Sequence, residues 1–375
     1  MSPPNTSLGQ ILNNWAAGQK PTALDWQQLA AEALASPQQA RAFGMTPANV
    51  EEMIEARSHL FQAVYPAVLS LPFFEVTPTN KQATLLTLLS LWNLWLPLAM
   101  QLSSSRQQLG RPLIQGILGG QGTGKTTLAA VLRLILAHLG YRTVSLSLDD
   151  LYKTYAERQQ LQKQDPRLIW RGPPGTHDVE LGKELLDQLR QPNQQHPILV
   201  PRFDKSAWGG AGDRTTPETV EGIDIVLFEG WFVGVRPIDP AVFDAATPAP
   251  IETLADRAFA RDMNEQLKEY LPLWERLDQL MLLYPTEYRL SQQWRRQAEQ
   301  QMIATGKSGM TDEQVDEFVE YFWKSIHPEL FITPLTKNSS LVDLVIEIHP
   351  DHTISAIYRP SDIYSSSQGS SIQFL

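Results

Sequence analysis

The spacing of apolar residues divides the chain into two parts. Up to about residue 105 they recur at helical intervals, and no segment alternates as a strand would. A helix is predicted over residues 23–35, after Thr22, and another over 46–64, where Pro47 stands near the start. The first part is therefore expected to be a helical N-terminal region over residues 1–105.

One apolar segment of this region, residues 85–102, approaches the length of a membrane span. No basic cluster flanks it, and five residues interrupt it: Thr87, Ser90, Asn93, Pro97 and Gln101. We therefore expect a buried helix, or one docked on the rest of the protein, and no membrane partner. A polar stretch that begins at Ser103 and ends in Gly-Arg-Pro then predicts a junction.

After this junction the pattern is that of an α/β protein. A short apolar run over 113–118 stops at glycines, an apolar-rich helix is predicted over 128–140, and an alternating β-branched strand over 143–148. Strand, helix and strand within about 40 residues are typical of the βαβ unit of a parallel sheet. The fold class expected for residues 106–360 is therefore a parallel β-sheet flanked by helices.

Further elements are predicted along the same domain. Helices are expected over 180–189, 287–304 and 311–325. Further buried strands are expected over 197–200, 223–228 and 280–284, and two more over 341–358 around a His-Pro-Asp-His turn. That turn could suggest metal ligands, but the nearby sequence supplies no others, which favours a polar β-turn. The low-complexity end, residues 361–375, is expected to be a flexible tail.

Composition narrows the class of protein. The chain has 375 residues, 42% of them hydrophobic, which is ample for a large core. Its net charge of -10 disfavours a general nucleic-acid binder, although local basic clusters could still bind small anions. Cysteine is absent, which excludes a disulfide scaffold, a thiolate zinc site and a cysteine nucleophile. The first residues lack the features of a secretory signal, so a cytoplasmic protein is expected.

A glycine-rich segment after the first strand of this domain carries the clearest chemistry. Residues 119–126 match the phosphate-binding pattern G-x-x-x-x-G-K-[ST]. Its glycines let successive N–H groups point inward, and the helix N-terminus adds unpaired donors. A chance glycine-rich turn is the alternative, and the strand before it and the helix after it disfavour that alternative. The residues assigned to nucleotide binding are Gly119, Gly120, Gln121, Gly122, Thr123, Gly124, Lys125, Thr126 and Thr127.

The remaining parts of a phosphoryl-transfer site stand in this segment and after two later strands. Lys125 can reach the β- and γ-phosphates, and the Thr126 hydroxyl can bind Mg²⁺. Asp149 is assigned as the base that takes the acceptor's proton; Asp150 is the alternative base, or a cap for the next helix. Glu229 ends an apolar strand that looks like a Walker B strand, so it is assigned to the metal. Each acid could instead be an ordinary capping residue.

Two loops, residues 171–182 and 201–214, gather basic side chains in an otherwise acidic protein. Their four cations are Arg171, Arg202, Lys205 and Arg214. A guanidinium fork matches a carboxylate, so a small anionic acceptor is expected. Asp178 could bind hydroxyls of that acceptor, and His177 could donate to a phosphate or orient Asp178. Surface ion pairing is the alternative for each of these residues.

Together these motifs resemble a known family. In order and spacing, GGQGTGKTTL, LSLDDLYKT, GPPGTHDVELG, PRFDKSAWGGAGDR and VLFEGWFVG are similar to the D-glycerate 3-kinases of plants and cyanobacteria. The resemblance covers roughly residues 110–360. That family is related to phosphoribulokinase, uridine kinase and bacterial pantothenate kinase.

The resemblance implies a P-loop kinase that uses ATP and Mg²⁺ and transfers the γ-phosphoryl group to the 3-hydroxyl of D-glycerate. It implies a role in photorespiration or glycolate salvage, and it makes Asp149 the base. Tyr152 is also assigned to the acceptor site. A lid is implied around Trp294, where Arg295 or Arg296 would neutralise charge on the moving phosphoryl group; Arg295 is assigned as catalytic.

Two other functions fit parts of the pattern. A kinase of the same fold could act on uridine, ribulose 5-phosphate or pantothenate. A P-loop switch or ATPase is disfavoured, because the strand that ends at Glu229 continues as Glu-Gly-Trp and not as the Asp-x-x-Gly of signalling GTPases. The N-terminal region has no assigned chemistry, and a structural brace is favoured over a docking role. The sequence does not determine the oligomeric state.

Overall fold

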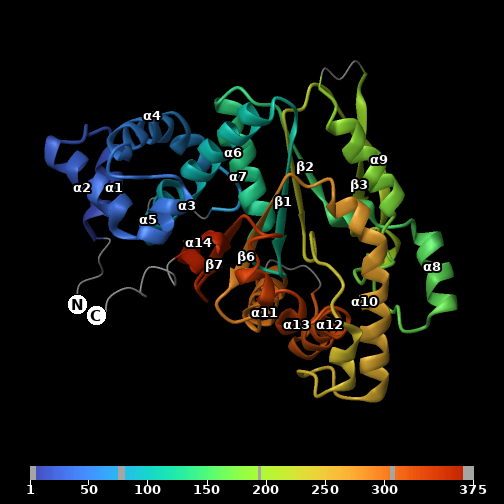
Figure 1. Cartoon of the computed structure of the whole chain (residues 1–375). Coiled ribbons are helices and arrows are strands. Elements are labelled where there is room, and N and C mark those ends of the chain that lie inside the picture. The colour runs from blue at the N-terminus through green and yellow to red at the C-terminus, as the bar shows by residue number, and fades with distance from the viewer. Residues whose placement is uncertain (1–5, 75–80, 193–195, 305–308, 366–375) are drawn as a thin grey trace, which may run out of the picture.

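The computed structural model describes residues 6–74, 81–192, 196–304 and 309–365. At its centre lies a six-stranded sheet in the order β2-β5-β1-β6-β7-β8 (Figure 1). Neighbouring strands from β2 to β7 pair in parallel, and β8 joins β7 antiparallel at the edge. The strands are β1 Leu113–Gly119, β2 Thr143–Ser147, β5 Ile225–Gly230, β6 Gln279–Pro285, β7 Leu344–Ile348 and β8 Ile354–Tyr358. The α/β class and the strands predicted for these positions are confirmed.

Helices cover both faces of this sheet because successive side chains of each strand point to opposite sides. Leu113 and Ile117 of β1 pack in the same hydrophobic cluster as α7 (Lys125–His138). Ile114 and Leu118 pack on the other face with α9 (Val179–Leu189) and α10 (Leu254–Trp274). Figure 1 shows α7 on one side of the sheet and α9 and α10 on the other. Such double burial explains why these strands are almost continuously apolar.

The N-terminal region is helical, as predicted, and its described residues contain no strand. Its helices are α1 Thr6–Ala16, α2 Ala23–Ala35, α3 Pro37–Ala42, α4 Val50–Leu69, α5 Lys81–Ser90 and α6 Leu96–Leu109, with a π-helical turn at Leu91–Trp95 between the last two. Thr22 caps α2, since its side chain accepts from the Asp25 backbone N–H. The start predicted near Pro47 is wrong: α4 begins at Val50, after Asn49.

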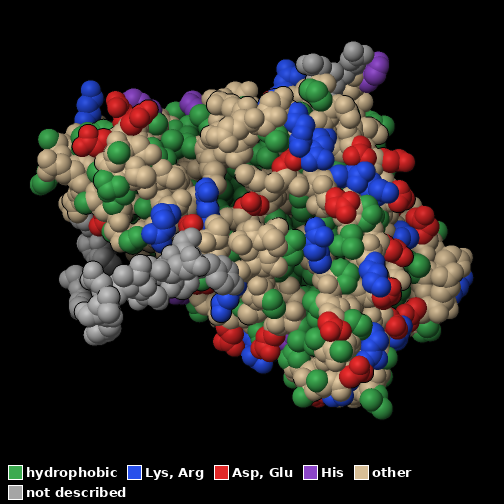
Figure 2. Space-filling model, in the orientation of Figure 1, with side chains coloured by type: hydrophobic (Ala, Val, Ile, Leu, Met, Phe, Trp, Pro, Cys, Tyr) green, Lys and Arg blue, Asp and Glu red, His purple; other side chains and the backbone are tan. Residues whose placement is uncertain are grey.

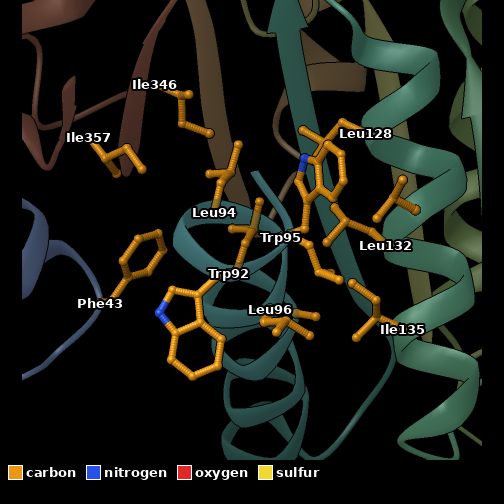
Figure 3. Packing of buried hydrophobic residues seen from close by; sticks show 14 of the residues in the cluster. Phe43, Trp92, Leu94, Trp95, Leu96, Leu128, Leu132, Ile135, Ile346 and Ile357 are labelled. Atoms are coloured by element: carbon orange, nitrogen blue, oxygen red, sulfur yellow. The ribbon is translucent and has the colours of Figure 1, made fainter. Parts of the chain in front are cut away.

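The apolar segment 85–102 lies in a helix that is buried within the protein. Among the described residues, one helix, Gln82–Leu109, is long and apolar enough to cross a membrane, and 56% of its apolar window is buried. Figure 3 shows Trp95 beside Leu128 and Leu132 of α7, and Leu94 toward Ile346 of β7. One hydrophobic cluster therefore joins the N-terminal helices to the central sheet, and the prediction of a buried helix is confirmed.

The prediction of a junction after the N-terminal region is wrong. The junction predicted at Ser103 is helix, because α6 continues to Leu109 and ends where Gly110 adopts a left-handed φ of 67°. Polar residues are tolerated on the outer side of a helix, so they did not mark its end. The predicted boundary between residues 105 and 106 thus falls inside α6.

The strand predicted over 197–200 exists but lies outside the central sheet. It is the first part of β3 (Ile198–Asp204), which pairs antiparallel with β4 (Asp213–Val220) in a separate two-stranded sheet. Leu199 is 60% exposed, so this strand is buried on one side only. The two ends of the segment predicted as a loop, 201–204 and 213–214, are therefore strand.

The C-terminal part supplies the helices near the carboxyl end of β6. They are α11 Leu290–Ala304, α12 Asp312–Ser325 and α13 Pro328–Phe331. The predicted His-Pro-Asp-His turn is confirmed, since the His349 N–H donates to the Thr353 carbonyl at 2.9 Å. A short helix, α14 (Pro360–Ser365), occupies the start of the predicted flexible tail, and residues 366–375 lie outside the described residues. Figure 2 shows acidic and basic side chains interspersed over the side that carries α8 (Tyr155–Gln164), α9 and α10.

Candidate active site

The glycine-rich loop connects β1 to α7 and has the backbone that its sequence predicts. Gly122 and Gly124 have φ of 76° and 84°, a region that favours glycine. A Cβ at Gly122 would lie 2.5 Å from the Cβ of Trp294 on α11. The Lys125 ammonium donates to the Gly120 carbonyl at 2.9 Å, and the Thr123 hydroxyl donates to the same oxygen at 2.9 Å. The loop is thus held closed around the N-terminus of α7, the arrangement that binds phosphate.

Glu229 lies beside this loop, at the carboxyl end of β5. Its side chain lies on the same face of β5 as those of Ile225 and Leu227, which pack in the cluster with α7, and it is 9% exposed. Burial raises the pKa of Glu229, while the charge of Lys125 and the Ser147 hydroxyl oppose that rise. Burial likewise lowers the pKa of Lys125, and the carboxylates of Glu229 and Asp149 oppose it. Burial is the larger effect for both groups, and the opposite charges limit its effect on each pKa.

Asp149 lies in the same group of charges. It belongs to a 3₁₀ turn, Leu148–Leu151, that directly follows β2. Its Oδ2 is 2.6 Å from the ammonium of Lys205, and the Tyr152 hydroxyl also donates to its carboxylate. Burial raises the pKa of Asp149, but Lys205 and Tyr152 outweigh burial, so that its pKa lies below the usual value. An ionised carboxylate therefore lies close to Lys205 and acts on the charge of Lys125 in the phosphate-binding loop.

Asp150 has different partners and faces away from this group. Its carboxylate accepts from the Ser147 N–H at 3.0 Å, from Arg202 at 2.9 Å and from the Phe203 N–H at 3.2 Å. It therefore ties β2 to β3. Its proposed role as a helix cap is wrong, because Thr154 caps α8.

His177 is buried under the acceptor side of the site as a neutral imidazole. It is 1% exposed and stacks on the Tyr152 ring at 4.5 Å, and burial lowers its pKa to about 3. The Tyr270 hydroxyl accepts from the Gly175 N–H at 2.9 Å and lies 2.8 Å from His177 Nδ1. Tyr270 can then donate its own proton to Nδ1, which leaves the hydrogen on Nε2, where the described residues supply no partner. The ring therefore positions Tyr152 and carries no charge.

The four predicted cations have different surroundings. Arg202 pairs with Asp150 and Glu218, and Arg214 pairs with Asp178 at 2.9 Å. Asp178 also caps α9, since it accepts from the Leu181 N–H at 3.0 Å.

Arg171 donates to the carbonyls of Gly210 and Ala211. Lys205 alone of the four projects an exposed side chain, 65% accessible, onto Asp149.

The two arginines of the predicted lid each form an ion pair with a nearby acid. Arg295 contacts Glu299 of its own helix at 2.5 Å, and Arg296 contacts Asp316 of α12. Trp294 donates to the Pro350 carbonyl at 2.9 Å and stacks on His352 at 4.5 Å, which joins α11 to the turn after β7. A catalytic role for Arg295 stays a prediction.

Of two hollows among the described residues, one lies beside the phosphate-binding loop and one lies away from it. A cavity of about 50 Å³, lined mainly by apolar and aromatic side chains, lies beside Gly120 and Gln121. It has room for water and is too small for a nucleotide base. A larger groove of about 690 Å³ lies at the far end of α7, around Arg133 and Arg142, away from the phosphate-binding loop. The nucleotide is therefore expected on the open side of the loop, where Thr126 is exposed.

Three residues of the site were not predicted. Ser147 accepts from the Asp149 N–H at 3.3 Å and bonds to Glu229, and Tyr270 holds His177. Arg158 donates to the carbonyls of Ala211 and Gly212 in the loop after β3. A hydroxyl at the end of a strand before two aspartates could have indicated Ser147. The other two lie in helices whose sequences carry no such signal.

Comparison with known proteins places this site in a family. No family model matches the chain. It is 34% identical to the uncharacterized kinase mug58 of Schizosaccharomyces pombe, over 57% of this chain and 79% of that one. It is 32% identical to the chloroplastic D-glycerate 3-kinase of Arabidopsis thaliana, over 59% of this chain and about half, 49%, of that one. The solved structure of a D-glycerate 3-kinase from Cryptococcus neoformans is similar with a TM-score of 0.63 and 29% identity, over 71% of this chain and 98% of that one.

The chain belongs to the same kinase family as mug58 of Schizosaccharomyces pombe, and it is similar to proteins named D-glycerate 3-kinase. Its members named above are kinases, and the glycine-rich loop with Lys125 is the part that such enzymes use to hold ATP. The protein is therefore an ATP-dependent kinase. The strand that ends at Glu229, β5, lies next to β1, and β2, which is followed by Asp149, lies next to β5 on the same side, so both carboxylates stand at the sheet edge that carries the loop.

Proposed function

We propose that the enzyme transfers the γ-phosphoryl group of ATP to the 3-hydroxyl of D-glycerate and forms 3-phosphoglycerate and ADP. The observation that carries this proposal is the pair of Asp149 and Lys205 beside the phosphate-binding loop. A base and an exposed cation next to each other suit a small acceptor that has both an alcohol and a carboxylate. The likeness to proteins named D-glycerate 3-kinase supports the same acceptor.

The proposed reaction is an in-line displacement. Asp149 accepts the proton of the 3-hydroxyl as that oxygen bonds to the γ-phosphorus, and the bond from the γ-phosphorus to the bridging oxygen breaks to release ADP. The Lys125 ammonium would stabilise the negative charge of the phosphates, and the backbone N–H groups of the loop would donate hydrogen bonds to the phosphate oxygens. Most of the rate would come from positioning and from charge stabilisation.

The residues at the end of β5 and the start of α7 fit a magnesium ion. Thr126 offers an exposed hydroxyl at the helix N-terminus. Glu229 offers a carboxylate: Lys125 acts on it through its charge, whereas Asp149 is in direct contact with an ammonium, that of Lys205. Mg²⁺ keeps several waters and takes only one or two protein oxygens beside substrate phosphates. These two residues would hold it, and the ion would neutralise charge on the β- and γ-phosphates. The role in photorespiration or glycolate salvage that the family resemblance implies belongs to the same proposal.

A panel of acceptors tests the proposal. ADP release is measured with ATP and Mg²⁺ and, in turn, D-glycerate, L-glycerate, glycerol, uridine, ribulose 5-phosphate and pantothenate, and the product is identified by mass spectrometry. We expect rapid turnover with D-glycerate and a phosphate on its 3-oxygen. Rapid turnover with uridine alone would replace the acceptor, and release of ADP at the same rate without any acceptor would favour the ATPase or switch.

A further inference from the structure

Lys205 lies against the proposed base, Asp149, at the candidate active site. It follows β3, and its ammonium lies 2.6 Å from Asp149 Oδ2. Its charge also acts on Lys125 and Glu229, which places it among the groups around the transferred phosphoryl position. The side chain of Lys205 is 65% exposed and that of Asp149 is 28% exposed, so the lysine reaches the half-buried base from the solvent side.

The backbone that carries Lys205 is held firmly, although its side chain is not. Arg158 and Arg171 donate to the carbonyls of residues 210–212 in the loop between β3 and β4. Trp208, at a φ of 52°, stacks on Tyr155 at 4.9 Å and donates to Asp213 at 2.9 Å. The loop can therefore stay in place while the lysine side chain rotates away from Asp149.

This contact conflicts with the proposed role of Asp149. A carboxylate that already accepts from an ammonium and from the Tyr152 hydroxyl has less capacity to take a proton from an alcohol. Lys205 must leave before the transfer. The carboxylate of a bound acceptor offers the Lys205 ammonium an equivalent partner. The ion pair of Lys205 with Asp149 is solvent-exposed and therefore weak, so the ammonium can change partners easily.

We propose that Lys205 determines acceptor specificity by covering Asp149 until the carboxylate of the acceptor draws the ammonium away. The proposal rests on the proposed glycerate kinase activity. The enzyme then selects anionic acceptors in the transfer step as well as in binding. A neutral alcohol can enter the site, but it leaves Asp149 covered by Lys205 and is therefore not phosphorylated. Water lacks a carboxylate and cannot draw Lys205 away, so Asp149 stays covered and ATP is not hydrolysed.

The test compares the full-length enzyme with Lys205→Met and Lys205→Arg. Glycerol is the probe, because it keeps the terminal hydroxyl of glycerate and lacks the carboxylate. In Lys205→Met we expect kcat with glycerol and ADP release without acceptor to rise about fivefold or more, while kcat/KM with glycerate falls at least tenfold. Lys205→Arg keeps the charge and should keep both background reactions low.

Lys268→Met is the matched control. Lys268 also forms a 2.6 Å ion pair, with Glu265, and is 59% exposed, but it lies on α10 away from the site. All rates should stay at the wild-type values in this variant. A fall or no change in glycerol turnover in Lys205→Met, with only a raised KM for glycerate, would overturn the proposal and leave Lys205 as a fixed binding residue. If the wild type does not phosphorylate glycerate, the proposed function fails, and a rise in acceptor-independent ADP release in Lys205→Met still tests the covering of the base.

Discussion

At the scale of single residues, the site shows how two adjacent aspartates acquire different tasks. Asp149 and Asp150 share a 3₁₀ turn, but only Asp149 lies in the field of Lys125 and Glu229. Asp150 instead bonds to Arg202 and to two backbone N–H groups. The first faces Lys205 and the charges beside the phosphate-binding loop, whereas the second holds β3 against the end of β2.

Replacing each aspartate by asparagine should separate these tasks. Asp149→Asn keeps the shape and removes the base, so we expect kcat to fall by about two to four orders of magnitude with the Kd for ATP nearly unchanged. Asp150→Asn breaks charge-assisted hydrogen bonds and should lower the free energy of unfolding by about 1–3 kcal/mol with a smaller effect on kcat. Steady-state rates, calorimetric titration with ATP and urea denaturation check both. Substantial activity in Asp149→Asn would make the assignment of the base wrong.

His177 should make the stability of the enzyme sensitive to acid. Its pKa is about 3 in the folded protein and 6.5 in the unfolded chain, so between these values the unfolded chain binds a proton that the folded protein does not. Stability therefore falls as the pH falls through this window, by up to about 1.4 kcal/mol per pH unit. His177→Asn lacks the titrating group.

The difference in unfolding free energy between the wild type and His177→Asn isolates this effect. Urea denaturation at several pH values should show the wild type losing stability relative to the variant from about pH 6.5 downward. A constant difference from pH 7 to pH 4 would mean that the folded protein also protonates His177.

Residue type and position allowed part of the site to be predicted. Lys125, Asp149 and Glu229 follow strands of one parallel sheet, whose carboxyl ends must lie together. The partners of the arginines could not be predicted, because Arg202 and Arg214 find Glu218 and Asp178 only through the pairing of β3 with β4 and its position beside α9. Contacts between residues far apart in the sequence leave no local pattern.

At the scale of elements, the phosphate-binding loop and the lid helix α11 form one packed unit. Gly122 lies against Trp294, and Trp294 is held by Pro350 and His352 in the turn after β7. The loop shape therefore depends on elements from the end of the chain as well as on its own glycines. Helix α7 alone would not fix it.

Two alanine substitutions should distinguish backbone strain from this contact. Gly122 and Gly124 both have left-handed φ, but nothing lies within 4 Å of a Cβ built at Gly124, whereas the one at Gly122 would strike Trp294. Gly124→Ala should cost about 1–2 kcal/mol in stability. Gly122→Ala should cost more and weaken ATP binding as well, measured by thermal unfolding and calorimetric titration. Equal effects in the two variants would show that Trp294 does not shape the loop.

The elements that the sequence did not predict share one property. The end of α6 and the β3–β4 pair are half-exposed, so polar residues are tolerated in them and the apolar period that marks an element is broken. The central strands are buried on both faces and are recognisable from their apolar runs. Prediction succeeded where burial dictates the side chains and failed where the chain runs along the surface.

At the scale of the whole molecule, the N-terminal helices and the kinase core share one hydrophobic cluster. It contains Trp92 and Leu96 from the N-terminal region, Leu132 and Ile135 from α7, and Ile346 from β7 (Figure 3). The N-terminal helices therefore pack against the kinase core on the side of the central sheet that carries α7. This is the arrangement expected of a structural brace.

A shared core predicts that the two parts unfold together. Trp92 is 1% exposed, and Trp92→Ala should lower the free energy of unfolding by about 3–5 kcal/mol. Because Trp92 belongs to the same cluster as α7, the loss should appear equally in circular dichroism and in the temperature at which ATP binding is lost. Leu24→Ala, at a residue that is 71% exposed, is the control and should change neither. If Trp92→Ala splits the transition and ATP binding persists to the wild-type temperature, the N-terminal region folds independently and does not brace the kinase core.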